Sequence, residues 1–231
     1  RVVHTDINPI VKFKSSNKTL QWIFDAYVRT QNSNIHGCIP SDCPHRERLG
    51  YTGDGQLTAN VVMTCFDAES MYRKWIRDIA DCQDIFNGHV QHTAPFYGGG
   101  GGPGGWGGAM VIVPYAFYKH YGDITILERQ YDSMKAWIDW IVRTYVDENG
   151  LWSGGFQFGD WLALDGEDEF YTYGGTDRTY IASMYLRYCS GMVAEAAKVL
   201  AESTQAAGTT PGGTNPAENI AQLYQEEEYY R

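Results

Sequence analysis

The stretch "PGGWGGAMVIVPYAFYKHYGD", residues 103 to 123, decides the class of fold. From Ala109 onward it is apolar on nearly every side of a helix, and a helix of that kind is buried among neighbours all round. Gly122 is suited to end this helix, and Asp123 is well placed to cap the next one. The stretch therefore predicts a core helix near residues 107–121, surrounded by other helices.

Apolar residues at helical spacing predict six further helices. The first lies near residues 17–32, after N-cap candidates in "SSNKT", and its apolar positions are Leu20, Ile23, Phe24 and Tyr27. The others are expected near 55–65, 68–84, 123–144, 177–202 and 216–230. Long loops at 33–54, 85–106 and 146–176 separate them, and such loops in a compact domain are usually functional or disordered. We expect an all-α fold of helical hairpins whose functional loops share one end.

Composition narrows the possible partners. The chain has 231 residues, 43% of them hydrophobic, which is enough for one domain or for a piece of a larger one. Its net charge is −10 and it has no basic run, so nucleic acid and anionic membranes are poor partners and an uncharged ligand is favoured. No apolar run approaches the roughly 20 residues that cross a bilayer. We expect a soluble protein; the compartment is not determined, although five cysteines without a CxxC pair favour reduced thiols and the cytoplasm.

Titratable residues crowd the loop "SDCPHRERLGYTGDGQ", residues 41 to 56. A neighbouring cation lowers the pKa of one carboxyl while burial raises that of another. One carboxyl then stays protonated as a general acid, while others remain anionic and bind hydroxyls. The residues concerned are Asp42, His45, Arg46, Glu47, Arg48 and Asp54.

Two other interpretations of this loop are possible. It is a solvated loop if Arg46, Glu47 and Arg48 merely pair with one another, although the interleaved apolar residues argue for a loop packed on the fold. It is a zinc site if Cys38, Cys43 and His45 bind a metal, although no second pair of ligands follows at a useful spacing.

Two later loops carry aromatic residues. "FYGGGGGPGGWGG", residues 96 to 108, is either a binding loop around Trp106 or a mobile linker. "FQFGDWLALDGEDEF", residues 156 to 170, places Asp160 and Trp161 in an apolar context, where a carboxylate needs a partner. The acidic residues that follow, Asp165, Glu167, Asp168 and Glu169, are expected to form a surface turn. Residues 203–216, within "AESTQAAGTTPGGTNPAEN", are expected to form a flexible surface loop.

Carboxylates and indoles on loops, without a cofactor motif or a nucleophile elbow, are the equipment of glycoside hydrolysis. The first motif, "SDCPHRERLGYTGD", resembles the signature of the bacterial α-L-rhamnosidases of glycoside hydrolase family 78. "PGGWGGAMVIVPYAFYKHYGD" and "FGDWLA" are similar to the next two motifs of that family, in the same order. The resemblance implies an (α/α)6 toroid of six helical hairpins with its active site at one end. It also implies hydrolysis of terminal α-L-rhamnose from glycosides or polysaccharides with inversion.

The resemblance also implies residue roles. Glu47 is similar in position to the carboxylic acid that protonates the leaving glycosidic oxygen. The positions that match sugar-binding residues are Asp42, Arg46 and Asp54 for hydroxyls, Tyr51, Trp106 and Trp161 for aromatic walls, and Asp160 beside the last of these. No cofactor is expected, and the sequence gives no indication of calcium. The expected partner is a carbohydrate with terminal L-rhamnose.

The chain departs from the family in three ways. Trp106 is followed by Gly-Gly-Ala where the family usually has Gly-Asp-Ala, and Tyr51 stands where the family often has Trp. Seven helices are too few for six hairpins, so residues 1–231 are expected to be the first half, or slightly more, of one catalytic domain. The catalytic base is then expected outside this segment, unless Asp160, Asp165 or Glu167 supplies it, and the rest of the barrel or another subunit is expected to cover the break.

Two alternatives remain open on the residues alone. One is another toroid enzyme acting on sugars, such as a glucuronyl hydrolase, a lyase or a phosphorylase. The other is a helical domain that binds carbohydrate without turnover or serves as a scaffold, which the altered Trp-Gly-Gly-Ala stretch and the missing base favour.

Overall fold

The computed structural model describes residues 5–97, 102–164, 173–207 and 215–231. Helices form most of it, in the order α1 (Lys18–Asn34), α2 (Thr52–Cys65), α3 (Glu69–Asp81), α4 (Gly104–Gly107), α5 (Ala109–Tyr121), α6 (Thr125–Tyr145), α7 (Arg178–Ala207) and α8 (Pro216–Tyr230). A short antiparallel hairpin of β1 (Ile35–His36) and β2 (Ile39–Pro40) follows α1. No helix in the described ranges is long and apolar enough to span a bilayer.

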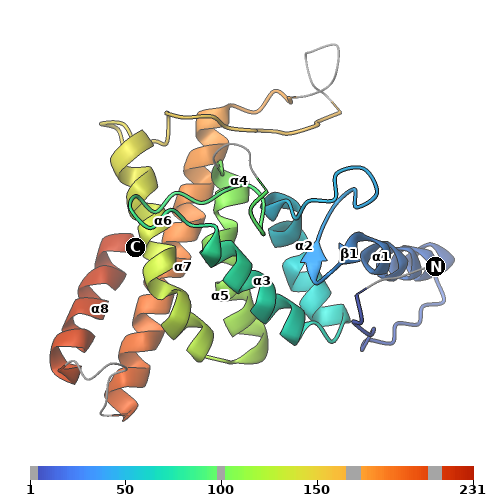
Figure 1. Ribbon diagram of the computed structural model, residues 1–231, viewed down its shortest axis with the longest axis horizontal. Helices are drawn as coiled ribbons and strands as arrows, with labels where there is room; N and C mark the ends of the chain where they lie inside the picture. The colour runs from blue at the N-terminus through green and yellow to red at the C-terminus, as the bar shows by residue number, and fades with distance from the viewer. Residues whose placement is uncertain (1–4, 98–101, 165–172, 208–214) are drawn as a thin grey trace.

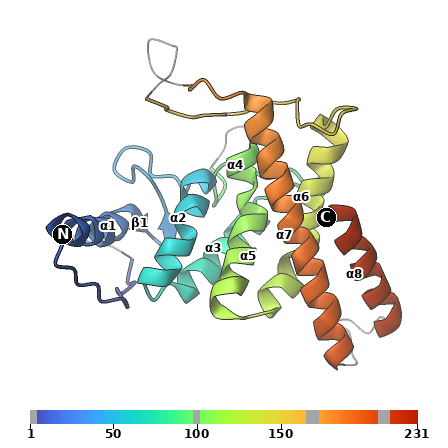
Figure 2. The same cartoon turned by 180° about the vertical axis from the view of Figure 1, so that it is seen from behind.

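The helices form an open arc in which α2 and α3 pack on α5, α5 packs on α6 and α6 packs on α7, with α8 packed on α7 (Figure 1). The three long loops lie together at the upper end in this view, and the short turns at 66–68 and 122–124 lie at the lower end. From behind, α7 lies between α5 and α8, and α1 lies at the far end of the arc (Figure 2). The prediction that the three long loops share one end is confirmed; their function stays a prediction.

The core surrounds α5, as its sequence predicts. Met110, Val111, Ile112 and Val113 are successive residues and each is at most 3% exposed, so every side of the helix is covered. Helices α2, α3, α6 and α7 provide this cover. Gly122 adopts a left-handed conformation with φ of 70° and ends the helix, which confirms its predicted role.

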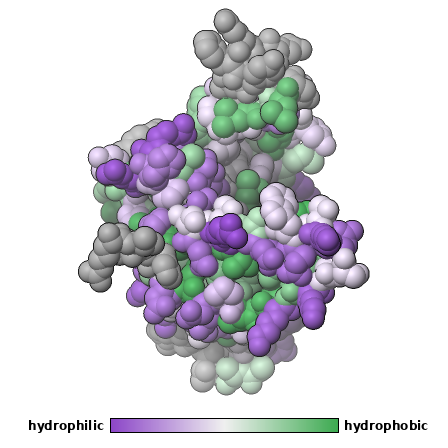
Figure 3. Space-filling view, turned by 90° about the vertical axis from the view of Figure 1, so that its right-hand side faces the viewer, coloured by the Kyte–Doolittle hydropathy of each residue, from purple (hydrophilic) through white to green (hydrophobic). Residues whose placement is uncertain are grey.

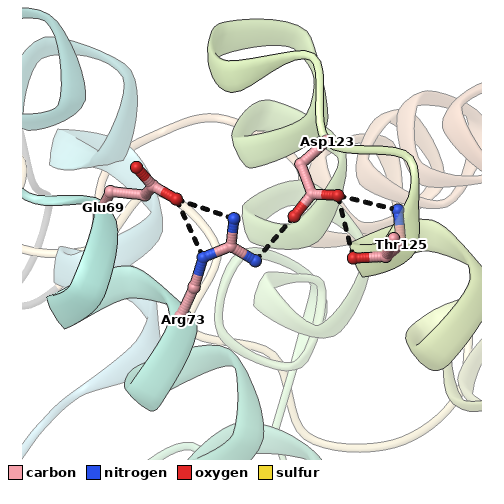
Figure 4. Close-up of polar contacts among 4 residues, drawn as sticks. All are labelled: Glu69, Arg73, Asp123 and Thr125. Atoms are coloured by element: carbon pink, nitrogen blue, oxygen red, sulfur yellow. Dashed lines mark hydrogen bonds and ion pairs between the residues drawn. The ribbon is translucent and has the colours of Figure 1, made fainter.

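A chain of polar contacts joins α3 to the turn before α6 (Figure 4). Arg73 donates to Glu69 Oε1 from Nε at 2.9 Å and from Nη2 at 2.7 Å, and its Nη1 lies 2.6 Å from Asp123 Oδ2. Asp123 Oδ1 accepts from the backbone N–H and the hydroxyl of Thr125, at 3.0 and 2.8 Å. Hydrogen bonds from Thr125 and Arg73 hold the pKa of Asp123 below its usual value. Asp123 therefore satisfies donors at the start of α6, as expected for a capping residue.

The structure corrects three boundaries. Helix α2 begins at Thr52 instead of residue 55, because Gly53 and Gly55 lie against tryptophans: an added Cβ would lie 2.5 Å from Trp106 and 2.1 Å from Trp75. Part of the glycine stretch is helical, as α4. Helix α7 continues to residue 207, so 203–207 are not a loop as predicted, and residues 208–214 lie outside the described ranges.

The first helix is confirmed, but much of its apolar face is uncovered. Asn17 caps it by accepting from the N–H groups of Thr19 and Leu20. Phe24 and Tyr27 are partly buried, whereas Leu20 and Ile23 are each 51% exposed and Trp22 is 69% exposed. An exposed apolar group of this kind marks a surface that another element covers.

Candidate active site

A cavity of about 230 Å³ lies at the loop end of the arc and brings three predicted site residues together. Asp54 lines it from α2, Trp106 from α4 and Trp161 from the loop between α6 and α7. The other lining residues described are Gly53, Gln56, Leu57, Pro103, Gly104, Gly105, Gln157, Phe158, Gly159, Ile181 and Tyr185. A carboxyl thus faces aromatic walls within one cavity, an arrangement that suits a sugar, which has hydroxyls and an apolar C–H face.

The glycine stretch is ordered where it meets this cavity. Gly104 N–H donates to Gln157 Oε1 at 3.2 Å, which links α4 to the third long loop. A Cβ on Gly104 or Gly105 would lie 3.2 or 3.1 Å from the side chain of Tyr185, so only small residues fit between α4 and α7. Residues 102–108 are therefore packed on the fold, which argues against a mobile linker in this part, and their role in binding stays a prediction; residues 98–101 lie outside the described ranges.

The first motif loop is fastened to the second long loop by backbone hydrogen bonds. Ala94 N–H donates to Gly50 O at 2.9 Å, and Thr52 N–H donates to His92 O at 3.0 Å. Tyr51 pairs with Thr93 in an isolated antiparallel bridge and stacks on His92, with ring centroids 5.8 Å apart and planes at 2°. This loop is therefore packed on the fold at its C-terminal end.

The charged residues at the tip of this loop contact one another. Arg46 Nη2 lies 2.8 Å from Glu47 Oε1; the side chain of Arg46 is 68% exposed and that of Glu47 is 24% exposed. Cys43 Sγ donates to Asp42 Oδ1 at 3.1 Å. The pairing of Arg46 with Glu47 is the one that the solvated-loop interpretation predicts, but Glu47 is more shielded than that interpretation expects.

A metal site from Cys38, Cys43 and His45 is not assembled. In the ranges described, the ligand atoms that lie within 4.8 Å of one another belong to Asp42, Cys43 and Glu47, without Cys38 or His45. Asp42 also lines a second, more open cavity of about 700 Å³ between the end of α1 and the first motif loop. Asp42 is thus not among the residues that line the cavity of Asp54 and the tryptophans.

Asp54 has the perturbed carboxyl of this site. Its pKa is raised from 3.8 to about 6, mainly by burial and to a smaller extent by the nearby carboxylates of Asp42 and Glu47, while a backbone hydrogen bond opposes the rise. A substantial share of this carboxyl is therefore protonated in mildly acidic solution, and it then donates a hydrogen bond. The sequence predicted that burial raises the pKa of one carboxyl in this loop. In the structure that carboxyl is Asp54.

Asp160 organises its own loop. Its Oδ2 accepts from the hydroxyl of Thr176 at 3.0 Å, and its backbone O accepts from Gly174 N–H at 2.8 Å. Trp161 pairs with Tyr173 in the adjacent bridge, and the guanidinium of Arg178 lies 4.0 Å from the centroid of the Tyr173 ring. The carboxylate that the sequence expected to need a partner has one in Thr176. Asp165, Glu167, Asp168 and Glu169 lie outside the described residues.

The same loop exposes apolar side chains. Leu162 is 60% exposed and Leu164 is 95% exposed. Seen from the side of α1, the surface is hollowed below an apolar strip that adjoins the grey segment (Figure 3). Trp161 is 39% exposed and lines the cavity.

Two residues of the site were missed by sequence reasoning. Phe158 lies 4.3 Å from Trp106 and 4.9 Å from Trp161 between ring centroids, and it lines the cavity. His92 meets Phe158 edge to face at 6.3 Å and stacks on Tyr51. The signal for Phe158 was its place directly before Gly-Asp-Trp, which was interpreted only as an apolar context.

Comparisons with known proteins agree with this architecture. The family model described as the bacterial alpha-L-rhamnosidase 6 hairpin glycosidase domain matches residues 9–229. An alpha-L-rhamnosidase of Streptomyces avermitilis is 30% identical over 202 residues, which are 87% of this chain and 18% of that protein. The chain thus spans about a fifth of the length of such relatives.

Solved structures of alpha-L-rhamnosidases also match this chain. The crystal structure of Streptomyces avermitilis alpha-L-rhamnosidase complexed with L-rhamnose matches all of this chain and 20% of its own, with a TM-score of 0.76 and 27% identity. Native alpha-L-rhamnosidase from Aspergillus terreus matches 99% of this chain and 26% of its own, with a TM-score of 0.79 and 29% identity.

Proposed function

Because this chain belongs to the family of bacterial alpha-L-rhamnosidase six-hairpin glycosidase domains, we propose that the full-length protein hydrolyses terminal non-reducing α-L-rhamnose from glycosides or polysaccharides. The observation that supports this most is the cavity in which Asp54 faces Trp106 and Trp161. It lies at the end of the arc where all three long loops meet (Figure 1). We propose an inverting mechanism, in which an acid protonates the leaving oxygen and a base activates water on the opposite face of the sugar.

Glu47 is the proposed general acid, by its position in the first motif. Its side chain is 24% exposed and carries an ion pair with Arg46, whose side chain is 68% exposed. Asp42, Arg46 and Asp54 are proposed to hold the rhamnose hydroxyls, and Tyr51, Trp106 and Trp161 to contact its apolar face. The carboxylate of Asp160 accepts a hydrogen bond from Thr176, so we propose that Asp160 holds the loop beside Trp161 in place. The catalytic base is proposed to lie outside residues 1–231.

Asp54 is the second candidate for the proton donor. Its pKa of about 6 keeps part of it protonated in mildly acidic solution, and it lines the aromatic cavity directly. The two assignments differ in what each substitution does. Loss of a general acid slows substrates with poor leaving groups far more than activated ones, whereas loss of a hydroxyl-binding group weakens both alike.

The test uses the full-length protein with an alkyl and a nitrophenyl α-L-rhamnoside. We expect Glu47→Gln to slow the alkyl rhamnoside by roughly 10²–10⁴-fold and the nitrophenyl rhamnoside much less. Asp54→Asn is expected to raise KM for both. Equal rates for Glu47→Gln and the unmodified protein would sink the assignment of Glu47, and selective loss of the alkyl substrate in Asp54→Asn would transfer the role to Asp54. Proton NMR of the first sugar released tests inversion, for which β-L-rhamnose is the expected product.

A binding function without turnover is the alternative of a different class. The glycines that follow Trp106, where the family usually has Gly-Asp, are the feature that favours it. Calorimetry that showed L-rhamnose binding to a full-length protein inactive on every rhamnoside would support this alternative. We propose no cofactor, and activity is expected to survive treatment with EDTA.

A further inference from the structure

We propose that Phe158 is the positioning residue of the aromatic walls, the ring that sets the orientation of Trp106 and Trp161 toward the sugar. This inference rests on the proposed function for its consequence in binding. The arrangement of rings on which it depends is observed within the described residues.

The first observation is the set of ring contacts. Phe158 lies 4.3 Å from Trp106, with planes at 44°, and 4.9 Å from Trp161, with planes at 60°. Its third neighbour is Phe156, at 4.9 Å. All three separations fall within the 4.5–7 Å range of favourable aromatic pairs or just below it. Phe158 thus contacts both tryptophans.

The second observation is where these residues come from. Trp106 belongs to α4 in the second long loop, whereas Trp161 belongs to the third. Tyr51 belongs to the first and stacks on His92 of the second, which in turn meets the edge of Phe158 at 6.3 Å. One continuous series of rings therefore crosses all three loops, and Phe158 is where its branches meet.

The third observation concerns the other supports of the two tryptophans. Trp106 stands over Gly53 of α2, where a Cβ would lie 2.5 Å from its indole, so α2 limits one side of this ring. Trp161 is 39% exposed and is otherwise held by Tyr173, 5.5 Å away. Without Phe158, each indole would lose a packing partner, so both would gain rotamer freedom.

Loss of the packing of the two indoles on Phe158 should weaken binding of the sugar more than it slows the hydrolytic step. The sugar would then have to order two mobile indoles when it binds, and this cost corresponds to a KM roughly tenfold higher. Since the indoles contact the sugar in the ground state and the transition state alike, kcat is expected to stay within about twofold.

The test compares Phe158→Leu with Phe156→Leu and Phe158→Tyr in the full-length protein. Phe156 is the matched control, because it is 60% exposed and lies beside Phe158. Fluorine NMR of protein labelled with 5-fluorotryptophan reports each indole. We expect Phe158→Leu to shift or broaden the signals of Trp106 and Trp161 and to leave that of the buried Trp75 unchanged, which shows that the fold is intact.

In the same variants, the hydrolysis of an aryl α-L-rhamnoside should show the rise in KM for Phe158→Leu, no change for Phe156→Leu, and recovery for Phe158→Tyr. Unchanged signals of Trp106 and Trp161 in Phe158→Leu would overturn the inference. So would a KM equal to that of Phe156→Leu. If the unmodified protein hydrolysed no rhamnoside, the proposed function would fail, while the NMR comparison would still decide whether Phe158 orients the two indoles.

Discussion

Replacing Asp54 by Asn should make the protein more stable at neutral pH while it weakens sugar binding. The reason is that burial raises the pKa of this carboxyl from 3.8 to about 6. The lower value applies to the unfolded chain and the higher one to the folded protein. At a pH between the two, the folded protein therefore holds the proton more tightly than the unfolded chain does. The free energy of unfolding therefore falls as pH rises through this interval and is constant above it.

The magnitude follows from the same pKa values. At about 1.4 kcal/mol per pH unit, the difference corresponds to about 3 kcal/mol. Because the carboxyl is only partly buried and remains screened by solvent, we take half of this, about 1.5 kcal/mol. Asp54 lies in the first turn of α2, where the helix dipole favours a negative charge by about 0.5 kcal/mol, and this opposes the gain. Asp54→Asn should thus gain about 1 kcal/mol at about pH 7.5.

Urea denaturation of both proteins at several pH values measures this. The difference in unfolding free energy should shrink as the pH falls through this interval and approach zero below about pH 3, where both states carry the proton. Asn adds no charge and has nearly the shape of Asp, so cavity effects are small. A variant that was less stable than the unmodified protein at neutral pH, or a difference that did not depend on pH, would refute the reasoning. The same variant should bind L-rhamnose more weakly by calorimetry.

Three further outcomes follow from packing and exposure. Arg73→Met removes both ion pairs of Figure 4 and should cost about 1 kcal/mol in urea denaturation, less at high salt; equal stability would contradict it. Gly55→Ala puts a Cβ 2.1 Å from Trp75 and should cost about 1–3 kcal/mol despite its better helix propensity, so a raised melting temperature would count against it. Residues 1–231 expressed alone should self-associate in light scattering, because Trp22 and its neighbours on α1 are exposed; a stable, active monomer would show that expectation to be wrong.

The sequence predicted the helices well because their signal is local. Spacing of apolar residues indicated every helix longer than one turn, and the long loops between them indicated a common functional end. Helix α4 was missed because a run of glycines carries an entropic cost that argues against order. Only the structure shows that Tyr185 and Gln157 pack against that run and compensate for the cost.

The site was predicted in part. Asp54, Trp106 and Trp161 stood out by residue type, and the structure brings them to one cavity. Phe158 and His92 gave no comparable signal, because their importance lies in contacts across loops that are far apart in the chain. In the same way, the sequence indicated that Asp160 needed a partner but could not show that Thr176, on the returning side of the same loop, supplies it.

The order of the hairpins along the chain also determines when the cavity forms during synthesis. Several large helix contacts join elements that are neighbours in sequence, such as α7 with α8, α5 with α6 and α6 with α7, and such local contacts form early in folding. Each hairpin can therefore pack on the preceding one as the nascent chain leaves the ribosome. The cavity, however, is lined by residues from Gly53 to Tyr185. A nascent chain that ends before α7 has a growing core but lacks part of the cavity lining, so folding of the framework precedes completion of the cavity.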